Sequence, residues 1–296
     1  MRFTKMHGLG NDYVYVDAIV DPTLRALDWQ SLAPMMSDRH RGVGGDGVIV
    51  IAPPHRANHH ARMRTFNADG SEAEACGNGT RCVARYLFER HGHDVELLAI
   101  ESGQRVLECD RTGDELIRVA MGIPGIGLDT CAVEPDALHD VAPSRIGIDG
   151  HALEFHAVSI GNPHAVVFAH ENEWLGVDLE SQIRRLGPRI ETHRAFRERI
   201  NVHFVRVDGL RHATMYTWER GAGITQACGT GACAVIVASV LEGLLEHESE
   251  LVLPGGGLHV SWHPDEAGGD GIVRQAGPAE FVFDGVWIDQ YERTLA

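Results

Sequence analysis

The sequence lacks a long uninterrupted apolar run. Its longest apolar stretch, residues 232–245, is interrupted by Ser239, Glu242 and Gly243 and is shorter than the roughly 20 residues that cross a bilayer. The first residues, Met1–His7, hold no apolar segment of the length found in secretory signal peptides. We therefore expect a cytoplasmic protein without a membrane partner.

Positive charge is scarce. The chain has 26 Lys and Arg residues against 42 Asp and Glu residues, a formal net charge of −16. A nucleic acid or an anionic membrane surface binds to a basic face, so this balance argues against both as partners. The 296 residues are enough for two domains of about 150 residues each. We expect a small-molecule substrate instead.

Cysteine is also sparse. Six cysteines in 296 residues are too few and too scattered for a disulfide framework, which favours a reducing compartment. A single cysteine is most often a small buried apolar side chain, and we expect this of Cys82, Cys109, Cys131 and Cys233. Cys76 and Cys228 differ because each lies in a glycine-rich turn.

Motifs for cofactors and metals are missing as well. The glycines at 42, 44 and 47 match G-x-G-x-x-G, but a predicted helix precedes them and a strand follows, the reverse of the dinucleotide-binding order. A phosphate-binding loop would have Gly-Lys-Ser/Thr where this chain has Gly79-Thr80-Arg81. The spacings Cys76-x5-Cys82 and Cys228-x4-Cys233 place the second cysteine inside a helix, which is unsuited to structural zinc. We expect no metal and no cofactor, and most of the eighteen histidines at the surface.

A helix is predicted to begin just after Cys228, because the apolar run that follows lacks glycine and proline until Gly243. The first turn of a helix has unpaired N–H groups and the positive end of the helix dipole, about half a unit charge. A thiol at such a position can have its pKa lowered from about 8.5 to roughly 3.5–7.5. We therefore expect Cys228 to act as a base near neutral pH.

Hydrophobic periodicity and turn residues predict an α+β chain. The predicted helices are residues 22–40, a segment from Thr80 to a stop at Gly92, residues 179–194, and the helix after Cys228. The predicted strands are 13–17, 48–52, 62–67, 95–101, 104–109, 116–120, 155–160, 165–168, 200–207, 214–218, 251–253 and 258–262. The segment 122–127, rich in glycine, is the clearest linker.

Four landmarks repeat in the same order at nearly one interval, which indicates an internal duplication. The separations are 152 residues for Cys76 and Cys228, 151 for Asn11 and Asn162, 152 for Asn67 and Glu219, and 153 for Gly103 and Gly256. We infer two similar α+β halves with a pseudo-twofold relation. The expected domains are residues 1–122 with 277–296, and residues 123–276.

Two thiols at two equivalent helix N-termini suit proton transfer at an amino-acid Cα. The unpaired N–H groups would hold the carboxylate and stabilise the charge that develops when the neighbouring Cα loses its proton. A thiolate on one face could remove that proton while a thiol on the other face delivers one, which inverts the centre. No motif for an electron-accepting cofactor is present, so the pattern indicates a cofactor-independent racemase or epimerase.

The sequence resembles one family closely. The blocks that resemble the signatures of diaminopimelate epimerase are Met6–Asp12, Phe66–Ser71, Ala75–Gly79, Gly161–His164, Glu219–Gly223 and Ala227–Gly231. They occur in the family's order between residue 3 and about residue 285. The resemblance implies two domains, each a curled and mostly antiparallel sheet around a central helix. It also implies a homodimer, and interconversion of LL- and meso-2,6-diaminopimelate in lysine and peptidoglycan-precursor synthesis without pyridoxal phosphate.

The resemblance also implies roles for individual residues. Cys76 and Cys228 match the two catalytic thiols, and His164 and Glu219 match the pair that tunes them. The residues implied to bind substrate are Asn11, Asn67, Gly77, Asn78, Asn162, Asn201, Glu219, Arg220, Gly229 and Thr230. Among these, Gly77, Asn78, Gly229 and Thr230 would hold the reacting carboxylate through backbone N–H groups.

The chain departs from the family pattern at Gly47, where many members have a glutamine, and at Ile224, where a glutamate is common. These departures leave the identity of the substrate less certain than the type of reaction.

Two alternative functions stay open. One is a racemase of the same fold for another amino acid, of the proline, hydroxyproline or histidine type; Cys-Gly-Asn-Gly in place of Cys-Gly-His, together with Arg220, argues against the proline class. The other is a thiol redox or metal-binding protein in which the cysteines pair.

Overall fold

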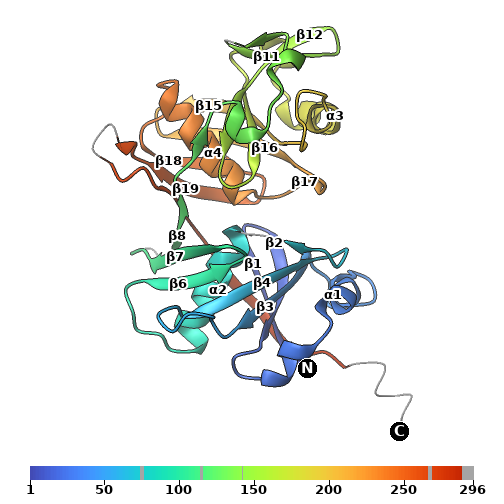
Figure 1. The fold of residues 1–296 in the computed structure, drawn as a ribbon, viewed down its shortest axis with the longest axis vertical. Helices are drawn as coiled ribbons and strands as arrows, with labels where there is room; N and C mark the ends of the chain where they lie inside the picture. The colour runs from blue at the N-terminus through green and yellow to red at the C-terminus, as the bar shows by residue number, and fades with distance from the viewer. Residues whose placement is uncertain (74–76, 114–115, 142, 266–268, 289–296) are drawn as a thin grey trace. The chain divides into compact units, whose positions relative to one another are not determined.

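The structure is a computed structural model, and it describes residues 1–73, 77–113, 116–141, 143–265 and 269–288 (Figure 1). The chain divides into two compact units. The first contains residues 1–119 and the segment that begins at 277, and the second contains residues 120–276. The sequence had placed the boundary after residue 122. No helix in the described ranges is long and apolar enough to cross a membrane.

The first unit is built on a mixed sheet. Its strands are β1 (Arg2–Gly8), β2 (Asn11–Asp17), β3 (Gly47–Ala52), β4 (Ala61–Asn67), β5 (Glu72–Ala73), β6 (Leu98–Ser102), β7 (Arg105–Arg111), β8 (Ile117–Gly122) and β21 (Glu280–Val286). They pair in the order β21-β1-β2-β3-β4-β6-β7-β8, with β5 alongside β4. The pairs β2–β3 and β4–β6 are parallel, and the others are antiparallel.

The second unit has its own mixed sheet. Its strands are β9 (Gly125–Ile126), β13 (His156–Ser159), β14 (Pro163–Phe168), β15 (Asn201–Gly209), β16 (His212–Glu219), β17 (Gly223–Ile224), β18 (Glu248–Leu253), β19 (Gly256–Trp262) and β20 (Val273–Gly277). They pair in the order β9-β13-β14-β15-β16-β18-β19-β20, with β17 alongside β16. The parallel pairs are β14–β15 and β16–β18. The segment 122–127, predicted as a linker, contains β9.

The strand order and the sequence of parallel and antiparallel neighbours are the same in the two units, which confirms the predicted duplication and α+β fold class. A separate three-stranded sheet extends the second unit. It consists of β10 (Asp140–Val141), β11 (Ser144–Ile148) and β12 (His151–Glu154). Short 3-10 helices lie at Asp129–Cys131, Pro135–Ala137 and Glu173–Leu175.

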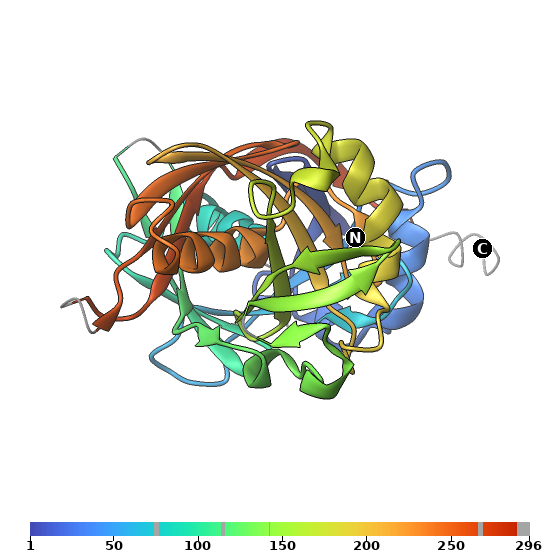
Figure 2. The ribbon, with the colours of Figure 1, turned by 90° about the horizontal axis from the view of Figure 1, so that it is seen from above.

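Each sheet packs against a buried helix. In the second unit this is α4 (Gly229–Leu241), whose residues are buried from Gly229 to Ser239 except Thr230. A helix that is apolar on every side must be surrounded by other elements, and α4 contacts β13, β14, β15 and β19 (Figure 2, orange). In the first unit α2 (Gly77–Arg90) has the corresponding place and contacts β1, β4, β6 and β7.

The helices α1 (Trp29–Ser37) and α3 (Leu179–Glu191) pack on the strands from outside this arrangement. The prediction of one helix over 22–40 is wrong, because Pro22–Ala26 is a 3-10 helix and Leu27 is extended. The side chain of Asp28 then accepts a hydrogen bond from the Ser31 N–H and starts α1 anew. Likewise α3 ends at Glu191, three residues before the predicted end.

Candidate active site

Cys228 lies at the N-cap of α4, where the sequence placed it. The thiol is buried, with 3% of the residue surface exposed. Its Sγ is 3.6 Å from Thr230 Oγ1 and accepts a hydrogen bond from the Gly231 N–H. Because the first N–H groups of a helix have no partner inside the helix, this thiol faces a natural binding place for a carboxylate.

The prediction of a lowered pKa for Cys228 is wrong in this structure. Burial raises the pKa of the thiol well above its usual value, and the carboxylate of Glu219 beside it raises it further. The hydroxyl of Thr230 and the N–H of Gly231 act in the opposite direction, but they are outweighed. Desolvation disfavours the charged form of any acid, and it exceeds the helix-terminus effect here. Cys228 is therefore a thiol at neutral pH.

The first turn of α4 is packed too closely for side chains at its glycines. A Cβ at Gly229 would lie 2.5 Å from Oε1 of Gln275, and a Cβ at Gly231 would lie 2.2 Å from Cε1 of His203. Gln275 is fully buried on β20, and its Nε2 contacts Met121 Sδ at 3.2 Å. Glycine at these positions lets the backbone of the turn approach its neighbours directly.

The turn after β16 is tied to the start of β15. The backbone N–H of Arg220 donates to Oδ1 of Asn201 at 2.9 Å, and Nδ2 of Asn201 donates to the Pro163 carbonyl at 2.9 Å. Asn201 is buried, whereas Arg220 is exposed and donates from Nη1 to the Glu198 carbonyl. The structure thus places Asn201 against the backbone of Arg220, and Glu219, the residue before it, beside Cys228.

A buried chain of side chains crosses three strands of the same unit. His164 Nε2 lies 2.9 Å from Asn162 Oδ1, His164 Nδ1 lies 2.8 Å from His203 Nε2, and His203 Nδ1 lies 3.0 Å from Thr217 Oγ1. The sequence singled out Asn162 and His164 but missed His203 and Thr217. His203 and His164 are fully buried, unlike the other histidines, which are exposed or half-buried as the sequence predicts for most of them. The sequence signal that could have indicated His203 is its two-residue spacing from Asn201, because residues two apart on a strand lie on the same face.

Both imidazoles of this chain are neutral. Burial lowers the pKa of His203 to about 3. Burial, the neighbouring His203 and the charge of Arg220 hold the pKa of His164 well below its usual value. The residue that the resemblance assigns to tuning the thiols is therefore an uncharged hydrogen-bonding group.

In the first unit, Cys76 lies outside the described residues. Gly77 and Asn78, the first residues of α2, are buried. Nδ2 of Asn78 donates to Oδ1 of Asn11 at 3.3 Å, so these two predicted site residues meet. Asn67, at the end of β4, donates to Ser71 Oγ at 3.0 Å.

Two further polar residues, Asp46 and Arg81, hold the side chains of Asn11 and Asn78 in place. Neither of them was identified from the sequence. Nδ2 of Asn11 donates to Oδ2 of Asp46 at 2.7 Å. The buried guanidinium of Arg81 donates from Nη2 to Oδ1 of Asn78 at 2.8 Å. Asp46 lies 35 residues from Asn11, so its spacing gave no signal. Arg81 follows Asn78 by three residues, and this one-turn spacing is the signal that could have indicated their contact.

The two departures from the family pattern have structural explanations. A Cβ at Gly47 would lie 2.1 Å from the carbonyl oxygen of Phe66, so this backbone admits no side chain there. Ile224 is half-buried on β17, pairs with Trp218 and packs against the apolar core of the second unit. A glutamate at Ile224 would place a charge against that core.

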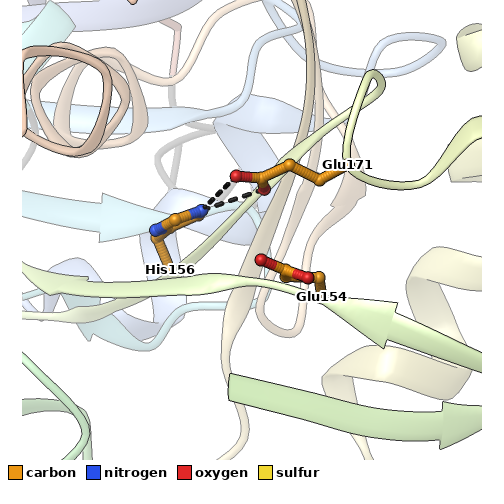
Figure 3. A group of neighbouring side chains, drawn as sticks. All are labelled: Glu154, His156 and Glu171. Atoms are coloured by element: carbon orange, nitrogen blue, oxygen red, sulfur yellow. Dashed lines mark hydrogen bonds and ion pairs between the residues drawn. The ribbon is translucent and has the colours of Figure 1, made fainter. Parts of the chain in front are cut away.

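One group of side chains in the described ranges has metal-ligand composition. The ligand atoms of Glu154, His156 and Glu171 lie within 4.8 Å of one another (Figure 3). Ion pairs account for these charges, since Glu154 is 2.7 Å from Arg145 and His156 is 2.9 Å from Glu171. Burial opposes the charge on His156, but the glutamates outweigh it and raise the pKa of the ring. We assign this cluster to ion pairing, and no metal to it.

Comparison with known proteins identifies the fold and the family of this chain. The fold matches the crystal structure of a hydroxyproline epimerase from Agrobacterium vitis with a TM-score of 0.66, over 96% of this chain and 90% of that one. At 15% identity the match defines the fold alone. The family profile of diaminopimelate epimerase matches residues 3–126 and 156–282.

Two relatives extend the match over nearly the whole chain. Diaminopimelate epimerase of Desulfitobacterium hafniense is 43% identical over 293 residues, 98% of this chain and 99% of that protein. Diaminopimelate epimerase of Methanococcus maripaludis is 40% identical over 96% of this chain and 99% of that protein. The protein is thus an isomerase of the epimerase class. The chain belongs to the diaminopimelate epimerase family, which confirms the resemblance.

Proposed function

We propose that this protein interconverts LL- and meso-2,6-diaminopimelate, a step toward lysine and peptidoglycan precursors. Family membership supports the substrate. The observation that carries the chemistry is the buried thiol of Cys228 at the N-terminus of α4, beside Glu219 and at the first N–H groups of the helix. This arrangement combines a proton donor with a carboxylate-binding place.

In the proposed mechanism one cysteine removes the α proton and the other delivers one. Cys76, as the thiolate, takes the proton, and the electron pair of the broken Cα–H bond spreads onto the carboxylate. The N–H groups of Gly229 and Thr230 stabilise that charge, with those of Gly77 and Asn78. The Cys228 thiol then protonates Cα from the opposite face, and the two cysteines exchange roles in the reverse reaction. No cofactor takes part.

We propose that the remaining site residues hold the distal end of the substrate, where its other ammonium and carboxylate groups lie. Arg220 suits a carboxylate, because its guanidinium can donate two parallel hydrogen bonds. Glu219 suits the ammonium. Asn201 supports the backbone of Arg220 through the 2.9 Å hydrogen bond described above. The asparagines with this proposed role are Asn11, Asn67, Asn162 and Asn201.

Deuterium exchange tests this proposal. Reduced protein incubated with LL-diaminopimelate in heavy water should incorporate deuterium at the α position and form the meso isomer, and absence of both would contradict the proposed function. Cys228→Ala and Cys76→Ala should each abolish net epimerisation. Cys233→Ala and Cys82→Ala are the controls, because they remove buried thiols of α4 and α2 that have no role in the proposed mechanism.

The same assay separates the alternatives. Loss of optical rotation from proline, hydroxyproline or histidine in place of diaminopimelate would indicate a same-fold racemase. Activity that requires an oxidised cysteine pair would indicate a redox protein, whereas the proposed mechanism needs both thiols reduced. No disulfide forms among the described cysteines, which are Cys82, Cys109, Cys131, Cys228 and Cys233.

We also propose a homodimer in the cytoplasm. The edge strand of the first unit, β21, exposes apolar side chains: Val282, Phe283 and Val286 are 51%, 48% and 64% exposed. Exposed apolar side chains along a strand favour pairing with a second copy. The cytoplasm is the reducing compartment that a mechanism with two free thiols needs. The acidic charge supports a small-molecule substrate without a nucleic-acid partner.

A further inference from the structure

The hydrogen-bond chain in the second unit has a fixed composition and order. It runs from Thr217 on β16 through His203 on β15 and His164 on β14 to Asn162, with contacts of 3.0, 2.8 and 2.9 Å. Thr217, His203 and His164 are buried, and Asn162 is partly exposed. The register of the sheet pairs His203 directly with Thr217, so the contact follows from strand pairing.

The hydrogen positions follow from the donors and acceptors available. A neutral imidazole has one N–H and one bare nitrogen. Asn162 contributes Oδ1, which only accepts, so Nε2 of His164 donates and its Nδ1 accepts. His203 then donates from Nε2 and accepts at Nδ1 from the hydroxyl of Thr217. Every hydrogen bond therefore points from Thr217 toward Asn162.

Protonation of His164 would break this order. A second proton on its Nδ1 would face the Nε2–H of His203 across the 2.8 Å contact between the two rings. Burial also disfavours a second proton on either ring, and the positive charge of Arg220 further disfavours one on His164. The chain is thus a set of neutral groups across the pH range in which the enzyme would work.

His203 also touches the helix that carries Cys228. Its ring lies so close to Gly231 that a Cβ at this glycine would be 2.2 Å from Cε1. The N–H of Gly231 is the group that donates to the Cys228 thiol. One side chain therefore contacts both the His164 ring and the first turn of α4.

We propose that His203, supported by Thr217, is a positioning residue that holds His164 as the neutral Nε2–H tautomer and so fixes the amide of Asn162. With Oδ1 of Asn162 bonded to His164, the Nδ2 group is the part of the amide that donates to a substrate oxygen. Asn162 then recognises a carboxylate and not an ammonium. This inference rests on the proposed function, because only there does Asn162 bind substrate.

The direct test removes the donor at position 203 while keeping a ring of similar size. In His203→Phe, Nδ1 of His164 has no donor, so His164 can adopt the other tautomer and the Asn162 amide can turn its oxygen toward the substrate. We expect KM for diaminopimelate to rise about tenfold, equal to about 1.4 kcal/mol, with kcat within about twofold. His203→Gln retains an N–H donor and should keep KM within about threefold. Thr217→Val should give an intermediate KM.

An unchanged KM in His203→Phe would overturn the inference, as would a loss in His203→Gln as large as in His203→Phe. A fall in kcat at unchanged KM would show a merely structural role and would overturn it too. If His203→Phe does not fold, ¹⁵N spectra of the wild-type protein decide, because they distinguish bare from protonated ring nitrogens. We expect His164 to carry its proton on Nε2; a proton on Nδ1, or a charged ring at neutral pH, would refute the inference. Wild-type protein without epimerase activity would instead refute the proposed function and leave the tautomer result standing.

Discussion

Gly231→Ala tests whether the first turn of α4 is as closely packed as the structure indicates. The substitution adds one methyl group, which would lie 2.2 Å from Cε1, 2.8 Å from Nε2 and 2.9 Å from Nδ1 of His203. These separations are too short for non-bonded atoms, so the ring must move. The ring is not free to do so, because both of its nitrogens are hydrogen-bonded, to His164 and to Thr217.

Two effects of opposite sign set the magnitude. Alanine is favoured over glycine inside a helix by roughly 0.5–1 kcal/mol. Overpacking a buried site costs about 1–3 kcal/mol, and loss of two hydrogen bonds costs a similar amount. The clash therefore wins, and we expect Gly231→Ala to lower the free energy of unfolding by about 1–5 kcal/mol. For a unit of this size each kcal/mol corresponds to a fall in Tm of about 2–4 °C.

Thermal unfolding followed by circular dichroism measures this effect. Gly209→Ala is the matched control, because a Cβ at Gly209, on the same strand as His203, would meet no atom within 4 Å. Its Tm should stay close to that of the wild type. A Gly231→Ala variant as stable as the wild type, or more stable, would refute the packing argument and weaken the assignment of His203 as a fixed neighbour of α4.

Three further predictions concern charge and assembly. Removing the negative charge beside Cys228 in Glu219→Gln should lower the pKa of that thiol, so alkylation of Cys228 by iodoacetamide at pH 8, followed by mass spectrometry, should become faster; an unchanged rate would contradict the assigned influence of Glu219. Burial opposes the charge on Glu101, but the N–H groups of His55 and Arg56 and the ring of His59 outweigh it and lower the pKa of Glu101 to about 2. Because this pKa is depressed on folding, the carboxylate stabilises the protein above pH 4.5 and loses that effect as the pH falls toward 2. Urea unfolding should show Glu101→Gln losing less stability than the wild type between pH 5 and pH 3, and equal losses would contradict this. Phe283→Glu should convert the proposed dimer to a monomer in light scattering, whereas a monomeric wild type would remove the proposal.

Much of the fold was accessible from local pattern. Strands and buried helices have different periods of apolar residues, and the repeat of landmarks near 152 residues showed that one arrangement is used twice. The prediction of one helix over residues 22–40 was wrong because a second helix-capping residue inside this segment was overlooked. Residues 22–40 contain a second capping aspartate, Asp28, and this cap divides the segment into a 3-10 helix and α1.

The candidate site was predicted unevenly. Glycine-rich turns and helix N-termini are local features, so the position of Cys228 at the start of a helix was predicted from sequence. His203 was missed because its hydrogen-bond partners lie 39 residues before it and 14 residues after it. The pKa of Cys228 was predicted with the wrong sign, because a helix terminus is visible in sequence whereas burial and the approach of Glu219 are not.

The sequence by itself determined the duplicated α+β architecture, the position of Cys228 at a helix N-terminus and the absence of common cofactor motifs. These features depend on the conformational preferences of residues that are neighbours in the sequence. Only the tertiary structure decided that Cys228 is a buried thiol, that His164 is neutral and that His203 and Thr217 extend its hydrogen-bond chain. Desolvation and hydrogen bonding act between groups that strand pairing and packing bring together, and these groups are distant in the chain.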